Sequence, residues 1–233
     1  MIEIITLRLA SARPISILVA SRRVGASLPK IRYTIEMRVL VATTNPGKVT
    51  EIRLALSEPA IELIGIDSIP GLAQPEETGS TFAENALLKA RFYHGATGLP
   101  AIADDSGLEV DALGGRPGVC SARYAGASST DQDRIDKLLR EMKDVPLEMR
   151  TGRFVCAAAF VWESGEIVFH GEVHGNILEE PRGNLGFGYD PVFYHSGLRR
   201  TFAEMTPDQK SSVSHRGIAL GKLAEWIKQS GLK

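Results

Sequence analysis

The chain of 233 residues has little of several features that would place it in a class at once. Its two cysteines, Cys120 and Cys156, are too few for a disulfide scaffold and form no Cys-x-x-Cys pair, so we expect both to be reduced thiols. No apolar run is long enough to span a bilayer. The formal net charge of −1 gives no basic field for nucleic acid. The sequence therefore predicts a cytoplasmic protein with neither a membrane nor a nucleic-acid partner.

The composition that remains is that of a globular protein, with 43% hydrophobic and 24% charged residues. The length fits one large domain or two small lobes. Residues 1–36 differ because they are basic, contain several serines and have few acids. They are either a transit peptide or an extension upstream of the true start at Met37, and we favour the extension. We expect these residues to be poorly ordered and to hold no catalytic group, and residues 37–233 to form the functional domain.

A strand, a polar loop and a helix open this domain. Residues 37–42 predict the strand, and apolar residues at helical spacing over 49–56 predict the helix. Pro46 and Gly47 suit the turn between them, and Lys48 stands where the helix begins. Free backbone N–H groups, the positive end of the helix dipole and a lysine together make an anion site, although the loop is not a Walker A sequence. The alternative is an ordinary turn with a solvated lysine.

Two adjacent carboxylates follow a second apolar run. Residues 99–103 predict a buried strand that ends at Asp104 and Asp105, and Ser106-Gly107 predicts a turn after it. Because side chains alternate along a strand, the two carboxylates should face different directions. One can then hold a metal ion or activate a water while the other supports the turn. A plain Asp-Ser-Gly turn is the alternative.

A second acidic pair, Glu76 and Glu77, lies in a polar loop before a helix. A capping-box pattern predicts that helix over residues 85–94, ended by Gly95, with Lys89 projecting from it. Two adjacent acids in a loop are more often simply solvated. Together with an aspartate they would supply the hard oxygen ligands that Mg²⁺ prefers.

Two further segments predict structure rather than chemistry. Residues 130–133 begin a capped amphipathic helix, and residues 154–162 and 166–173 form a β-hairpin. His170 and His174 on the second strand resemble half of a zinc motif, but that motif belongs on a helix. We interpret both histidines as structural or exposed.

The last part of the chain carries features suited to a nucleobase. Glycines on both sides of Phe187 leave its ring accessible, and such a ring can stack on a base for about 1–3 kcal/mol. Lys210, His215 and Arg216 form a basic cluster at the start of a terminal helix. A core position for the aromatic ring and a solvated basic turn are the alternatives. With the anion site and the acid cluster, these features predict a magnesium-dependent nucleotide hydrolase.

Five segments resemble the inosine/xanthosine triphosphate pyrophosphatases in that family's order and spacing: residues 43–51, 76–91, 103–108, 186–191 and 214–217. The resemblance covers Met37 to the C-terminus. It implies an α/β fold that is two-lobed, with a long mixed central sheet flanked by helices and an active-site cleft between the lobes, in a homodimer. It also implies hydrolysis of ITP, dITP and XTP to the monophosphate and pyrophosphate, which keeps these purines out of nucleic acids.

The resemblance implies a role for each matched residue. Asp105 is the general base, and Glu76, Glu77 and Asp105 hold the Mg²⁺ cofactor. The implied substrate-binding residues are Thr43, Thr44, Asn45, Pro46, Gly47, Lys48 and Lys89 at the triphosphate, Ser106 beside the base or sugar, and Phe187, Gly188, Tyr189, Asp190, Lys210, His215 and Arg216 at the base.

Specificity for these purines would rest on the 6-oxo group, which can accept a hydrogen bond from Arg216 or His215. Adenine presents an amino donor there and would leave the protein donors unpaired. Guanine keeps the 6-oxo group, so its rejection must come from the 2-position. Three alternatives stay open: a pyrophosphatase of another modified nucleotide, a non-catalytic nucleotide-binding protein, and a nucleic-acid-binding module, which the near-neutral charge disfavours.

Overall fold

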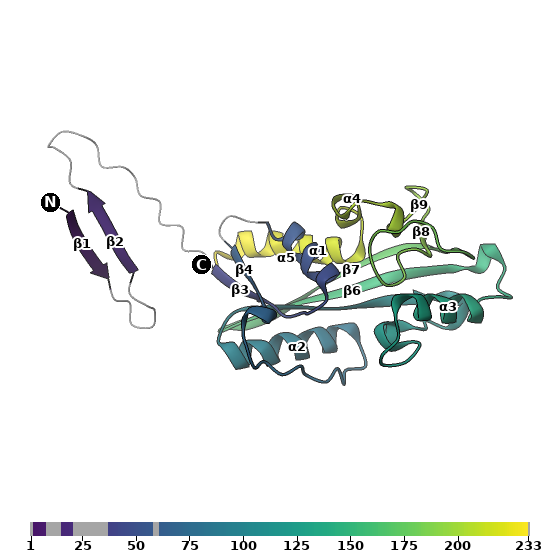
Figure 1. The fold of residues 1–233 in the computed structure, drawn as a ribbon, viewed down its shortest axis with the longest axis horizontal. Coiled ribbons are helices and arrows are strands. Elements are labelled where there is room, and N and C mark those ends of the chain that lie inside the picture. The colour runs from purple at the N-terminus through teal and green to yellow at the C-terminus, as the bar shows by residue number, and fades with distance from the viewer. Residues whose placement is uncertain (1, 8–14, 21–36, 58–60, 233) are drawn as a thin grey trace. The chain divides into compact units, whose positions relative to one another are not determined.

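The computed structural model describes residues 2–7, 15–20, 37–57 and 61–232, and it divides the chain into two units, Met1–Thr34 and Ile35–Lys233 (Figure 1). In the first unit, β1 (Ile2–Leu7) and β2 (Ile15–Ala20) pair as a two-stranded antiparallel sheet. The expectations about residues 1–36 fall largely on residues outside those described. Order, targeting and the position of the start therefore stay predictions.

The second unit is built on a mixed sheet of seven strands in the order β4-β3-β5-β6-β7-β8-β9. The strands are β3 (Met37–Val41), β4 (Ile61–Gly65), β5 (Ala101–Val110), β6 (Thr151–Trp162), β7 (Gly165–Ile177), β8 (Phe193–His195) and β9 (Arg200–Thr201). β3 pairs in parallel with both β4 and β5, whereas every pairing from β5 to β9 is antiparallel. The predicted mixed sheet and the predicted hairpin, β6–β7, are confirmed.

Helices cover both faces of this sheet (Figure 1). α2 (Phe82–Thr97) packs on β5 and β6, and α5 (His215–Ser230) packs on β6 and β7 with α1 (Pro46–Ala55) beside it. The remaining helices are α3 (Asp131–Glu141) and α4 (Pro207–Ser211), with short 3-10 helices at Ile66–Ser68, Asp111–Leu113, Gly118–Arg123, Leu147–Met149 and Phe202–Glu204. The α/β class expected from the sequence is therefore the observed one.

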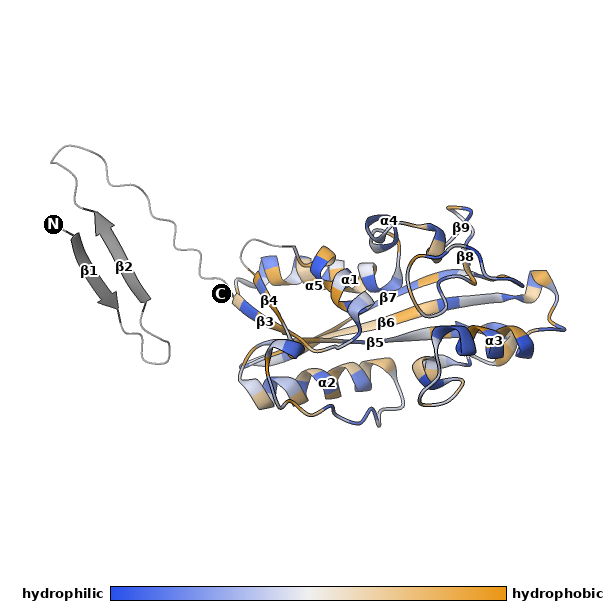
Figure 2. Cartoon of the chain, in the orientation of Figure 1, coloured by the Kyte–Doolittle hydropathy of each residue, from blue (hydrophilic) through white to orange (hydrophobic). Residues whose placement is uncertain are grey.

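Hydrophobic residues gather on the strands and on the helix sides that face them (Figure 2). One cluster between the sheet and α1 and α5 contains Ile52 and Leu220, and a second beneath α2 contains Ala86. A third, which contains Leu138 and Phe193, joins α3 to the hairpin and to β8. The amphipathic faces predicted for the helices that begin near residues 49 and 130 are therefore the faces that are buried.

The capping box predicted for α2 is present, but the helix is longer than predicted. Thr81 Oγ1 accepts a hydrogen bond from the Glu84 N–H at 3.1 Å, and Glu84 Oε2 accepts one from the Thr81 N–H at 3.2 Å. The helix passes through Gly95 and ends at Thr97, and the following Gly98 caps it with a left-handed φ of 69°. A glycine ends a helix only where the chain takes this conformation, so the predicted stop at Gly95 is wrong.

The predicted turn at Ser106-Gly107 is also wrong, because β5 runs through it unbroken. Each residue of β5 pairs with one of β6, and the ladder of hydrogen bonds outweighs the local turn preference of these residues. Gly107 serves close packing instead: a Cβ there would lie 2.5 Å from the Gly118 carbonyl oxygen. The two aspartates therefore lie in the middle of a strand and not at its exit.

Other expectations concern single residues. Cys120 is exposed, Cys156 is buried, and neither is in a disulfide. The side chain of His174 is largely exposed, as expected. Within the described part of the chain, no helix combines the length and the apolar composition needed to cross a membrane.

Candidate functional site

One pocket brings together most of the predicted site residues. Its cavity volume is about 160 Å³. The predicted residues that line it are Asn45, Lys48, Glu77, Asp105, Ser106, Phe187, Gly188, Tyr189, Asp190, Lys210, His215 and Arg216. Residues from both halves of the sequence therefore meet at one place.

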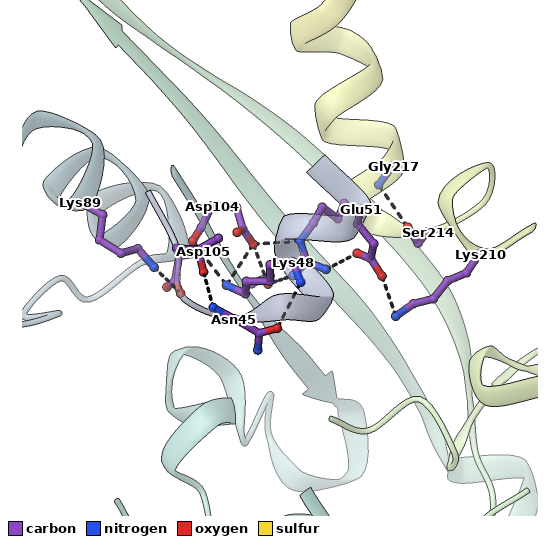
Figure 3. Close-up of polar contacts among 12 residues, drawn as sticks. Asn45, Lys48, Glu51, Lys89, Asp104, Asp105, Lys210, Ser214 and Gly217 are labelled. Atoms are coloured by element: carbon purple, nitrogen blue, oxygen red, sulfur yellow. Dashed lines mark hydrogen bonds and ion pairs between the residues drawn. The ribbon is translucent and has the colours of Figure 1, made fainter. Parts of the chain in front are cut away.

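The two aspartates of β5 face opposite sides of the sheet, as the alternation of strand side chains predicts (Figure 3). Asp104 Oδ2 lies 3.1 Å from Lys48 Nζ and 3.0 Å from Arg216 Nε. Asp105 instead faces α2, where Lys89 Nζ lies 3.5 Å from its Oδ1. Adjacent carboxylates thus have separate cationic partners.

Asp104 has the environment of a permanently ionised carboxylate. Burial alone would raise its pKa, but the charges of Arg216 and Lys48 outweigh burial and hold the pKa well below its usual range. Ser106 Oγ donates to Asp104 Oδ2 at 3.1 Å and accepts from Arg216 Nη2 at 2.6 Å. This carboxylate therefore fixes two cations and a hydroxyl at the pocket wall.

Asp105 has the opposite character. Burial raises the pKa of its carboxyl above the usual value, against the lowering effect of Lys89 and Lys48. Asn85, fully buried on α2, donates to Asp105 Oδ2 at 3.2 Å. The Asn85 carbonyl accepts the Gly79 N–H at 2.8 Å, which sets the orientation of the amide. Asp105 is therefore held in place and has a basicity suited to proton transfer.

The acidic loop contributes one carboxylate to this region. Glu77 Oε1 lies 2.7 Å from Lys89 Nζ, and the same ammonium reaches Asp105, so one cation lies between two carboxylates. Glu76 is exposed and does not line the pocket. Among the described residues, no three His, Cys, Asp or Glu side chains gather closely enough to hold a metal by themselves. Two carboxylates facing a shared cation do fit Mg²⁺, which commonly takes one or two protein carboxylates and fills its other positions with water and phosphate.

The strand-to-helix loop has the geometry of an anion site. Asn45 caps α1 by accepting the Lys48 N–H at 3.1 Å, and Pro46 occupies the first turn. No acidic residue occupies that first turn, so the positive end of the helix is not neutralised. Thr43 Oγ1 accepts the Asn45 N–H at 3.2 Å, and neither Thr43 nor Thr44 lines the pocket.

Elsewhere in the pocket, an aromatic ring lies against buried cations. Phe187 is half-buried, with Lys210 Nζ 4.3 Å and the Arg216 guanidinium carbon 5.6 Å from its ring centre. Lys210 Nζ in turn lies 2.5 Å from Asp190 Oδ2. The ring passes close to Gly47, where a Cβ would lie 2.6 Å from Phe187 Cε1. Phe187 therefore lines the pocket as an accessible ring, and Gly47 makes room for it.

His215 is a neutral ring in this environment. Burial and the nearby Arg216 and Lys210 charges hold its pKa well below the ordinary value. Its ring stacks on Phe154 with centroids 4.6 Å apart. Its Nδ1 is buried and has no hydrogen-bond partner within the described ranges. This nitrogen can therefore serve a ligand in the pocket.

Glu51 is a buried residue to which the sequence analysis assigned no role. It is 5% exposed, pairs with Arg216 and lies 2.9 Å from Lys210 Nζ. These cations outweigh the effect of burial and lower its pKa. The sequence feature that could have indicated a role for Glu51 is its spacing from Lys48, because residues three apart lie on one face of a helix.

Comparison with known proteins agrees with this site. The sequence model of the Ham1 family matches residues 39–226. A "dITP/XTP pyrophosphatase" of Photorhabdus laumondii is 47% identical over 196 residues, which cover 83% of this chain and 99% of that protein.

Solved structures show the same fold. A HAM1 protein from Coxiella burnetii superposes with a TM-score of 0.76 at 41% identity and covers 83% of this chain and 99% of its own. A nucleoside-triphosphatase, also named dITP/XTP pyrophosphatase, from Mycobacterium abscessus gives 0.65 at 45% identity, covering 80% of this chain and 98% of its own. The resemblance and the α/β fold expected from the sequence are confirmed, and the chain belongs to the Ham1 family.

Proposed function

We propose that this protein hydrolyses the non-canonical purine nucleoside triphosphates ITP, dITP and XTP to the monophosphate and pyrophosphate, with Mg²⁺ as cofactor. The observation that carries the proposal is the position of Asp105. This carboxylate has a raised pKa and lies in a pocket that Lys48 and the Phe187 ring also line. The names of the relatives point to the same reaction.

The triphosphate would bind at the end formed by α1 and α2. The positive end of the α1 helix dipole and the ammonium groups of Lys48 and Lys89 offer positive charge there. These groups neutralise the charge that develops on the phosphates during attack. Because both lysines already pair with carboxylates, binding substrate means sharing these cations between protein and phosphate oxygens.

Asp105 would act as the general base that takes a proton from the attacking water. Asn85 holds one oxygen of this carboxylate and leaves the other facing Lys89. Glu77 and Asp105 would hold Mg²⁺, which when bound supplies Lewis-acid stabilisation of the phosphate oxygens. The exposure of Glu76 favours Glu77 as the ligand from the loop. Attack at the α-phosphorus releases pyrophosphate as one leaving group.

The base would stack on Phe187, with its edge toward the buried polar groups. Arg216 can donate to the 6-oxo group of hypoxanthine or xanthine. His215, neutral and with an unpartnered Nδ1 within the described ranges, can offer a further hydrogen bond. Adenine would leave these groups unpaired, which can discriminate strongly against it. Tyr189 is buried and donates to the Ser121 carbonyl at 3.0 Å, so we assign it to support the wall.

The resemblance supports three further proposals: the protein is a homodimer, it acts in the cytoplasm beside the nucleotide pool, and the pocket is the cleft between two lobes. Light scattering on the purified protein tests the first, with the mass of two chains expected. A monomeric mass at working concentration would contradict it.

The test of the reaction is pyrophosphate release from ITP, XTP, GTP and ATP, with magnesium and then with EDTA. Release from ITP and XTP alone, lost with EDTA, is the expected result. Release from none of the four would favour a nucleotide-binding protein. Equal release from all four would contradict the base-edge assignment, and release that survives EDTA would contradict the role of Mg²⁺.

A further inference from the structure

The loop of residues 186–190, here called the Phe187 loop, is held by hydrogen bonds from two successive backbone N–H groups. Its flanking glycines take left-handed conformations, with φ of 74° at Gly186 and 62° at Gly188. The Phe187 N–H donates to Asp190 Oδ2 at 2.9 Å, and the Gly188 N–H donates to Asp131 Oδ2 at 2.6 Å. One fastening carboxylate belongs to the loop itself, whereas the other comes from α3.

Asp131 stands at the start of α3 but does not cap it. That role belongs to Thr130 and Asp133, because Thr130 Oγ1 accepts the Asp133 N–H at 3.2 Å and Asp133 Oδ2 accepts the Thr130 N–H at 2.8 Å. The carboxylate of Asp131 is therefore available for a contact outside its own helix. The contact of Asp131 with Gly188 therefore plays no part in capping α3.

Arg134 fixes the other oxygen of this carboxylate. Arg134 Nη2 pairs with Asp131 Oδ1, and Arg134 Nη1 donates to the Ser129 carbonyl at 2.6 Å and to the Ala122 carbonyl at 3.0 Å. The Arg134 side chain is 16% exposed. A guanidinium with three backbone or carboxylate partners is a rigid support, so Asp131 is oriented before any ligand enters.

Asp131 also lies in the same region of the pocket as the Phe187 ring. It lines the main pocket and the neighbouring pocket formed by the α1 loop, and Phe187 lines both as well. The ring lies between Gly47 and the Lys210 ammonium, so a small shift of its backbone would change the surface offered to a base.

We propose that Asp131 is a positioning residue that sets the Phe187 ring for base stacking, so that α3 contributes to base affinity through the ring. The inference rests on the proposed function, because it assumes that a base stacks on this ring. It predicts that the loss of Asp131 lowers base affinity more than phosphate affinity, because the carboxylate binds the Phe187 loop at Gly188.

The test measures equilibrium binding of two probes, inosine monophosphate and inorganic tripolyphosphate, by calorimetry. In Asp131→Ala we expect the affinity for inosine monophosphate to fall about tenfold, within the range of a lost stacking contact, and the affinity for tripolyphosphate to stay within about twofold. Asp131→Asn keeps an acceptor for the Gly188 N–H and should restore most of the affinity. In ITP hydrolysis, the Ala variant should raise KM about tenfold, whereas kcat should change by less than about threefold.

A double-mutant comparison decides whether the effect passes through the ring. In a Phe187→Ala background, Asp131→Ala should cause no further loss of inosine monophosphate affinity. An equal additional loss there, or a matching loss of tripolyphosphate affinity, would overturn the proposal. If Asp131→Ala does not fold, Asp131→Glu keeps the charge but displaces the acceptor, and wild-type affinity in that variant would also overturn it.

The wild-type protein separates this inference from the function on which it rests. Wild-type protein that binds tripolyphosphate but not inosine monophosphate would overturn both. Wild-type binding of inosine monophosphate that is unchanged in Asp131→Ala would overturn the role of Asp131 alone.

Discussion

Asp104 and Asp105 are neighbours in β5, yet their carboxylates lie on opposite sides of the sheet and their pKa values shift in opposite directions. One is fully buried between Arg216 and Lys48 and stays ionised. The other is held by Asn85 and Lys89 and has a raised pKa. Asp104 therefore has a structural role, whereas its neighbour Asp105 has the properties of a chemical group.

The first prediction concerns Asp105→Asn, which removes a charge with little change in volume. Turnover of ITP should fall at least about 100-fold, as expected for the loss of a general base. The fold should persist, because Lys89 keeps its contact with Glu77. Steady-state rates and a thermal melt check both parts. Full turnover in this variant would place the base elsewhere, with Asp104 the nearest candidate.

The second prediction concerns Asp104→Asn, the matched change one residue earlier. Here the loss should fall on stability, about 3 kcal/mol, because the buried Arg216 guanidinium and the partly buried Lys48 ammonium lose an anionic partner. The value lies at the low end of the range for broken buried pairs, since Glu51 still pairs with Arg216. Denaturant unfolding measures the difference. A change below about 1 kcal/mol would contradict the structural role of Asp104.

The third prediction distinguishes the two glutamates of the acidic loop. Glu77→Gln should raise the magnesium concentration for half-maximal activity at least about tenfold, since it removes a ligand from the proposed site. Glu76→Gln is the control and should behave as wild type, because Glu76 is exposed and does not line the pocket. A titration of activity against magnesium gives both values. The reverse pattern would move the ligand to Glu76.

The fourth prediction uses Gly47. In Gly47→Ala the new methyl group would overlap the Phe187 ring and displace it, so KM for ITP should rise about three- to tenfold, a part of the stacking energy. Gly221→Ala serves as the control, because a Cβ at that helical position meets nothing within 4 Å. A Gly47→Ala enzyme with wild-type KM would show that the ring does not need this space.

The fifth prediction concerns pH and His215. Its pKa in the folded protein lies well below the ordinary value of 6.5, so below pH 6.5 the unfolded chain binds a proton that the folded chain does not. Stability should therefore fall as the pH drops through 6.5, by about 1.4 kcal/mol from this group at pH 5.5. Unfolding of wild type and His215→Leu at pH 7.5 and 5.5 tests this. An equal loss of stability in both proteins would contradict it.

The sequence predicted local structure well wherever the signal was local. The capping box at Thr81 and the apolar face of α1 depend on residues a few positions apart, and both are present. The turn at Ser106-Gly107 failed because β6, some fifty residues later, supplies the partner that keeps β5 extended. Short-range preference could not anticipate that pairing.

In the candidate site, too, local motifs were predictable and contacts between distant segments were not. The motifs alone predict that Lys48, Asp105 and Phe187 share one site, and all three line the same pocket. The supporting roles of Glu51 and Asp131 were missed, because each depends on a contact between distant segments. Glu51 meets Arg216 across 165 positions, and Asp131 meets Gly188 across 57. Such roles follow from the fold and not from a residue's own surroundings in the sequence.

Arg216 gives the site an order of assembly along the chain. This guanidinium, which joins Asp104, Ser106 and Glu51, belongs to α5 and follows all three partners in the sequence. A nascent chain that has produced β5 but not α5 therefore lacks the buried guanidinium that two of its carboxylates share. The wall of the pocket that these residues form can take its final arrangement only after α5 has been synthesised.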